Sequence, residues 1–119
     1  MENLLATALI KTVGIAKSYS MKNKDIRTYN FFQLLTQLNF VEKIILFGSR
    51  ARQDNQERSD IDIAIICPQA SSSDWHTILN IIDEADTLLS VDCIRFDELQ
   101  NSNPFKERII KDGIILYEK

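Results

Sequence analysis

The stretch Phe47–Ile65, FGSRARQDNQERSDIDIAI, decides the fold, because it joins the end of one apolar segment to the beginning of another. On its upstream side, Lys43–Phe47 is short and rich in strand-forming residues, which predicts a buried strand that ends at Gly48. On its downstream side, Ile61–Cys67 predicts a second strand, which Pro68 closes. The connection between them is polar and charged, so we expect a turn there.

Further elements are predicted on both sides of this pair. Upstream, apolar residues at helical spacing predict one helix through Leu5, Leu9, Val13 and Ala16, and a second from Ile26 to Leu38 behind an Asp25 cap. Downstream, the pattern predicts a helix with the apolar face Trp75, Ile78, Leu79, Ile82, Ala85 and Leu89, a strand over Val91–Phe96, a short helix from Pro104 to Gly113, and a last edge strand over Ile114–Tyr117. This order predicts an α+β protein, an α/β sandwich with a mixed sheet of about four strands flanked by helices.

Length and charge limit the function. The 119 residues are enough for one domain, expected over 1–119, with 1–23 as an extra N-terminal helical segment. The net charge of -3 gives no general attraction for polyanions, so no direct nucleic-acid binding is expected.

A start without basic residues and the lack of a long apolar run favour a cytoplasmic protein that does not contact a membrane. Cys67 and Cys93, in apolar runs, are interpreted as reduced core thiols, although a buried disulfide stays open.

The Gly48-Ser49 turn is the first candidate binding feature. A strand that stops here and turns into a short helix would expose backbone N–H groups that favour phosphate. Gly48 would allow an anion to approach the backbone closely, and the Ser49 hydroxyl would add a donor. Taken alone, a Gly-Ser turn is common and weakly specific.

Asp60 and Asp62 form the second candidate feature. Residues i and i+2 of a strand share a face, so the two carboxylates would lie side by side while Ile61 and Ile63 enter the core. Such a pair repels itself unless a cation lies between its members, and hard oxygen ligands suit Mg²⁺ or Mn²⁺. The alternative is a solvated strand entrance with Asp60 in a turn and Asp62 facing water.

Asp92 interrupts a segment that otherwise has the pattern of a buried strand. A carboxylate among such neighbours is costly without a cation or hydrogen bonds, which makes Asp92 a third site candidate. The alternative is an aspartate on the exposed face of an antiparallel edge strand.

Taken together, these motifs resemble the minimal nucleotidyltransferases of the DNA polymerase β-like superfamily. The resemblance rests on Gly48-Ser49, ten intervening residues, the Asp60-x-Asp62 pair and Asp92 on a later strand, and it extends roughly from Lys24 to Lys119. It implies the nucleotidyltransferase fold and two Mg²⁺ ions as cofactors, with Mn²⁺ as an alternative.

The resemblance also implies roles for residues. Gly48 and Ser49 would hold the β- and γ-phosphates, Asp60 and Asp62 would bridge both metal ions, and Asp92 would ligate the ion that activates the attacking hydroxyl. Of the three arginines in the connection, Arg50, Arg52 and Arg58, we expect Arg52 to bind phosphate. This chain has Gln53 where the family commonly has glycine, and glutamine would strain the loop if that position needs a positive φ.

The function implied is transfer of a nucleoside monophosphate, in the first place AMP from ATP, to a hydroxyl acceptor. The family resemblance suggests an antitoxin that adenylylates a tyrosine of a helical HEPN-type toxin. Two alternatives stay open: a non-catalytic module that occludes its partner, and a transferase that modifies a small molecule as aminoglycoside-modifying enzymes do. A homo-oligomer also stays open.

Overall fold

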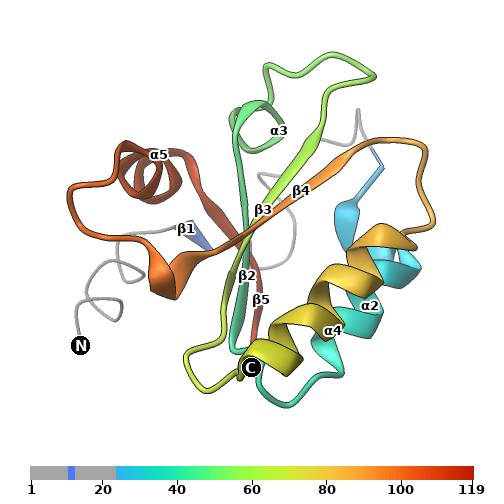
Figure 1. Cartoon of the computed structure of the whole chain (residues 1–119). Helices are drawn as coiled ribbons and strands as arrows, with labels where there is room; N and C mark the ends of the chain where they lie inside the picture. Colours follow the sequence, from blue (N-terminus) through green and yellow to red (C-terminus); the bar gives the residue numbers. More distant parts are fainter. Residues whose placement is uncertain (1–10, 13–23) are drawn as a thin grey trace.

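The structure is a computed structural model that describes residues 11–12 and 24–119. It contains a mixed sheet with helices on both faces (Figure 1). The elements are β1 (Lys11–Thr12), η1 (Ile26–Thr28), α2 (Asn30–Thr36), β2 (Lys43–Phe47), α3 (Ser49–Arg52), β3 (Ile61–Ile66), α4 (Ser72–Asp83), β4 (Val91–Arg95), η2 (Phe96–Glu98), α5 (Pro104–Asp112) and β5 (Ile114–Glu118).

The strand order is β1-β5-β2-β3-β4. β2 is antiparallel to both β3 and β5, whereas β3 and β4 are parallel, which confirms the predicted mixed sheet. Because β2 runs against β3 and β4, the end of β2 and the beginnings of β3 and β4 lie at the same end of the sheet. The two halves of the Phe47–Ile65 stretch therefore meet there.

Two predictions about the sheet edge and the first helix are wrong. The predicted edge strand, β5, is internal, because Lys11 and Thr12 pair with Ile114 and Ile115 in parallel. These two residues were expected in a helix, but the open backbone of β5 offers them hydrogen-bond partners that outweigh the local periodicity. The rest of the predicted helix lies outside the described residues.

The two faces of the sheet are covered unequally (Figure 1). On one face α2 and α4 lie side by side, and their apolar residues join alternate strand residues in the larger core cluster. Its fully buried strand residues include Ile44, Leu46, Ile61, Ile63 and Ile65. On the other face α5 covers a smaller cluster made of Ile45, Phe47, Ala64, Ile66, Phe96, Ile109 and Ile115.

The helix boundaries follow capping residues. Ser71 and Asp74 form a reciprocal capping box at α4, and Asn103 accepts a hydrogen bond from Phe105 N at the start of α5. The helix predicted from Ile26 is divided at Tyr29, whose ψ of 144° is extended, and Asp25 caps only the short η1 segment. No helix among the described residues is long and apolar enough to cross a membrane.

Asp86 caps α2 from the connection between α4 and β4. Its carboxylate accepts hydrogen bonds from Asn30 N and Phe31 N, at 3.0 and 3.1 Å. These bonds lower the pKa of Asp86. This cap comes from residues more than fifty positions away, so no local pattern in the sequence could indicate it.

Candidate nucleotide-binding site

Gly48 has a backbone conformation that other residues rarely adopt. Its φ of 75° and ψ of −157° lie in a region essentially restricted to glycine. A Cβ atom at this position would also collide with the Asp62 carboxylate, whose Oδ2 is its nearest neighbour. The turn after β2 is therefore in direct contact with one of the three candidate acids.

Asp62 and Asp92 are neighbours across β3 and β4. They pair in register, and Phe47 pairs with Asp62 on the opposite side, at the end of β2. Since Ala64 and Ile94 continue the same face, both carboxylates lie on the side of the sheet that α5 covers, beyond the apolar cluster. Asp62 is partly buried and Asp92 is exposed.

The pKa of Asp62 is raised to about 6. Burial is the largest cause, followed by the charge of Asp92 and by a hydrogen bond between the two carboxyl groups. A raised pKa is what close carboxylates predict, although burial outweighs the expected repulsion. The nearby Arg52 acts in the opposite direction but is the weakest of these influences.

Asp60 is exposed and lies just before β3. Its charge raises the pKa of Asp62 less than that of Asp92 does, so the neighbour across the strands has more effect than the neighbour two positions away. In residues 11–12 and 24–119, no three or more histidine, cysteine, aspartate or glutamate side chains are arranged to hold a metal ion. The cross-strand pair Asp62–Asp92 is therefore the centre of the acidic site.

The three arginines of the connection have different environments. Arg50 is only 5% exposed and donates hydrogen bonds to the carbonyls of Ser59 and Glu57, at 2.8 to 3.1 Å. It thus closes the loop between α3 and β3. Arg52 is more exposed and forms ion pairs with two acids, described below. Arg58 lines a pocket.

Gln53 adopts the left-handed conformation, with φ 64° and ψ 28°. It is the only non-glycine residue with positive φ in the described part of the chain. Its N–H donates to Ser49 O and ends α3. This confirms that the position where the family commonly has glycine requires a positive φ, which glutamine adopts at a cost.

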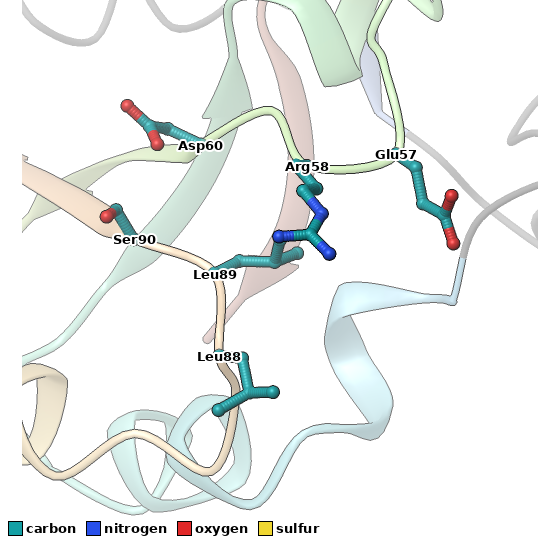
Figure 2. Close-up of a pocket in the computed structure, with 6 residues that line it drawn as sticks. All are labelled: Glu57, Arg58, Asp60, Leu88, Leu89 and Ser90. Carbon is teal, nitrogen blue, oxygen red and sulfur yellow. The ribbon is translucent and has the colours of Figure 1, made fainter.

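A pocket of about 490 Å³ adjoins Asp60 (Figure 2). It lies between the segments that lead into β3 and β4, and its lining residues are Glu57, Arg58, Asp60, Leu88, Leu89 and Ser90. Figure 2 shows the Arg58 guanidinium beside Leu89, with the Asp60 carboxylate pointing away from both. Leu88 is fully exposed. The sequence pattern did not single out Leu88, because a leucine beside a helix end has the same pattern as a core residue.

Both cysteines are free thiols. Burial raises the pKa of Cys67 to about 11 and that of Cys93 to about 12. Such thiols stay protonated and unreactive near neutral pH, which agrees with their interpretation as core residues.

The sequence matches the family model described as polymerase beta, nucleotidyltransferase, over residues 30–119. This chain belongs to that family. The match includes the Gly48 turn, all three candidate acids and the strands that carry them. No curated protein matches the chain.

Solved structures share the nucleotidyltransferase fold. A crystal structure of a toxin-antitoxin with AMP-PNP has a TM-score of 0.53 at 20% identity, covering 76% of this chain and 73% of that chain. A putative nucleotidyltransferase from Sulfolobus solfataricus has a TM-score of 0.50 at 20% identity, with 75% of each chain covered. The toxin-antitoxin MntA-HpeT, as a mutant with two aspartates changed to glutamate, has a TM-score of 0.50 at 19% identity, covering 73% and 69%. At these identities the likeness concerns the fold.

Proposed function

We propose that this nucleotidyltransferase transfers a nucleoside monophosphate, in the first place AMP from ATP, to a hydroxyl of a partner protein. The observation that carries the proposal is the Asp62–Asp92 pair in contact with the Gly48 turn. Two carboxylates lie this close, and the pKa of one is raised to about 6, so the positive charge of the nearby Arg52 does not outweigh burial and repulsion.

The donor chemistry of this pair fits divalent cations. Asp62 and Asp92, with Asp60 beside them, would hold Mg²⁺ through hard oxygen ligands, and Mn²⁺ would suit the same ligands. Bound there, the metal would neutralise charge on the phosphates and lower the pKa of the attacking hydroxyl. The protein itself would supply the position of the acids through the parallel register of β3 and β4.

The strand order supports an assignment of the two sides of the reaction. At one end of the sheet, Gly48 follows β2, Asp60 and Asp62 flank the first residue of β3, and the pocket segment leads into β4. An in-line displacement needs the leaving and attacking oxygens on opposite sides of the phosphorus. We assign the leaving pyrophosphate to the Gly48–Arg52 side, where Ser49 and Arg52 would contact phosphate, and the acceptor to the pocket at Leu88.

A protein acceptor is favoured by the surface around this pocket. Leu88 is fully exposed beside Asp60, and apolar side chains exposed at a site rim favour protein contacts. Two of the similar structures are of toxin-antitoxins. We therefore propose an antitoxin role in which the acceptor is a tyrosine of a HEPN-type toxin.

The test is co-expression of this chain with a helical protein encoded by an adjacent reading frame, where there is one, followed by incubation with ATP and Mg²⁺. We expect a stable complex and a partner heavier by one or more AMP groups in intact-mass spectrometry. Asp62→Asn, which removes one of the paired acids, serves as the inactive control.

Other outcomes would select the alternatives. A stable complex whose partner stays unmodified with all four nucleotides would indicate occlusion without catalysis. Pyrophosphate release with a small hydroxyl compound, in the absence of any partner, would indicate a small-molecule transferase.

A further inference from the structure

Arg52 is held by two carboxylates, which accept from different nitrogens of its guanidinium group. Its Nε donates to Asp54 Oδ2 at 3.0 Å, and its Nη1 donates to Asp112 Oδ2 at 3.1 Å. A guanidinium has five N–H groups, so three remain on Nη1 and Nη2. Within residues 24–119 these three have no hydrogen-bond partner, and the side chain is 43% exposed. Two of the five N–H groups are therefore held by carboxylates, and three are available.

The two carboxylates do not fix Arg52 equally. Asp54 is only two residues away, in the connection that follows α3, so this pair is local to one segment of the chain. Asp112 ends α5, sixty residues along the chain, and ties the guanidinium to the helix that covers the sheet. Only Asp112 can therefore fix the orientation of Arg52 relative to the acidic site.

The position of Asp112 is unfavourable for its own helix. It is the last residue of α5, where the negative end of the helix dipole disfavours an acidic side chain. The side chain is only 15% exposed, and Arg52 is its only ion-pair partner among residues 24–119. A residue that breaks a local rule in this way is expected where function requires it.

Arg52 also lies within electrostatic reach of the acidic site. Its positive charge lowers the pKa of Asp62, against the effects of burial and of Asp92. It belongs to the same four-residue helix as Ser49, directly after the Gly48 turn. The guanidinium thus links the end of α5 to the side of the site assigned to the phosphates.

We propose that Asp112 is a positioning residue, which holds Arg52 so that the remaining N–H groups of its guanidinium face the phosphates of the nucleotide. The inference rests on the proposed function and adds a residue that neither the sequence motifs nor the resemblance includes. Asp112 acts only through Arg52 and touches no reacting atom.

The decisive variant is Asp112→Asn, with Asp54→Asn as the matched control. We expect Asp112→Asn to raise the Kd of ATP·Mg²⁺ about threefold to tenfold, measured by calorimetry, with kcat at saturating ATP nearly unchanged. Asp54→Asn should change the Kd less than twofold, and Asp112→Glu should restore most of the affinity. Because an acid is removed from a helix C-terminus, the melting temperature of Asp112→Asn should not fall.

A second measurement follows Arg52 directly in arginine-labelled protein without nucleotide. The Arg52 Nη1–H signal, whose proton is donated to Asp112, should exchange slowly with water in wild-type and Asp54→Asn protein. It should exchange faster in Asp112→Asn protein. An Arg52 signal that exchanges at the same rate with and without Asp112 would overturn the inference, whatever the activity.

The binding results separate this inference from the proposed function. If wild-type protein binds ATP·Mg²⁺ and Asp112→Asn binds it equally well, the positioning role is wrong and the proposed function stands. If wild-type protein binds neither ATP·Mg²⁺ nor inorganic triphosphate, both are overturned. Binding of triphosphate alone, weakened by Asp112→Asn, would keep the positioning role and remove the transferase.

Discussion

The two faces of the sheet divide the tasks of the molecule between them. The face under α2 and α4 is filled by fully buried side chains such as Ile63 and Ile65. The face under α5 is apolar only in part, and where its smaller cluster ends, the same strands present Asp62 and Asp92. Alternation along β3 therefore places a core residue and an acid one position apart. Substitutions on the first face should change stability, and those on the second should change chemistry.

The largest expected effect is on transfer by Asp92→Asn. The change keeps the shape of the side chain, so binding of nucleotide·Mg²⁺ should stay within about tenfold of wild type, or ~1.4 kcal/mol. Loss of a metal ligand beside the nucleophile should raise the barrier by several kcal/mol, at about 1.36 kcal/mol per decade of rate. Calorimetric titration and partner modification measure the two effects.

The control for this variant is Asp83→Asn, an exposed acid at the end of α4 on the other face. It should affect neither measurement. If the Asp92→Asn protein keeps more than a tenth of the wild-type rate, the role assigned to Asp92 in the site is wrong.

Gly48→Ala should damage both stability and activity. The backbone conformation of Gly48 costs alanine roughly 1–3 kcal/mol, and the new methyl group would displace the Asp62 carboxylate. We expect a lower melting temperature together with weaker nucleotide binding. Adding Asp62→Ala should relieve the collision but not the backbone strain, so the double variant should be more stable than Gly48→Ala and remain less stable than Asp62→Ala. If the double variant loses as much stability as the two single variants together, the inferred collision between the methyl group added by Gly48→Ala and the Asp62 carboxylate is wrong.

Asp62 should also contribute less to the stability of the folded protein at neutral pH than in acid. The pKa of Asp62 is about 6 in the folded protein against 3.8 for a free side chain, so its contribution is fully present below about pH 3.8 and is lost as the pH rises through about 6. In metal-free buffer, Asp62→Asn should therefore gain stability over wild type as the pH rises. Because Asp62 is only partly buried, we expect a gain on the order of 1 kcal/mol.

Calorimetry across this pH range provides the measurement, and Ile65→Val provides the control from the other face. That variant should lose about 0.5–1.5 kcal/mol at every pH, because it removes only a methyl group from the core. Mg²⁺ should shrink the advantage of Asp62→Asn. A difference between Asp62→Asn and wild type that is constant with pH would contradict the raised pKa.

The smallest expected effect concerns Gln53→Gly. Glycine removes the cost of the left-handed conformation but gains freedom in the unfolded chain, so we expect a stabilisation of up to about 1 kcal/mol. Gln56→Gly, in the same loop without a positive φ, should destabilise slightly. Denaturant unfolding can compare the two, and equal effects would show that the backbone angle of Gln53 is not the cause.

The sequence predicted what local patterns can carry. The strands predicted over Lys43–Phe47 and Ile61–Cys67 depend on neighbouring residues, and both are present in the structure, the second ending at Ile66. Pairings between distant segments were not predictable in the same way. The parallel β1–β5 contact, the Asp86 cap of α2 and the Arg52–Asp112 ion pair each join residues that no periodicity relates.

The site shows the same division. Spacing indicated that Asp60 and Asp62 would lie together. The acid that raises the pKa of Asp62 most, however, is Asp92, thirty residues away. The parallel register of β3 and β4 creates that pair, and register depends on the whole sheet.

The Arg50 clamp has a consequence for how related sequences can diverge. Arg50 holds the loop before β3 by the carbonyl oxygens of Glu57 and Ser59, so the clamp recognises the path of the backbone and no particular side chain. Substitutions between Asp54 and Ser59 can accumulate without moving Asp60, whereas an insertion or deletion would pull both carbonyls out of reach. Related sequences should therefore keep the arginine and the length of this loop, while the residues between Asp54 and Ser59 vary.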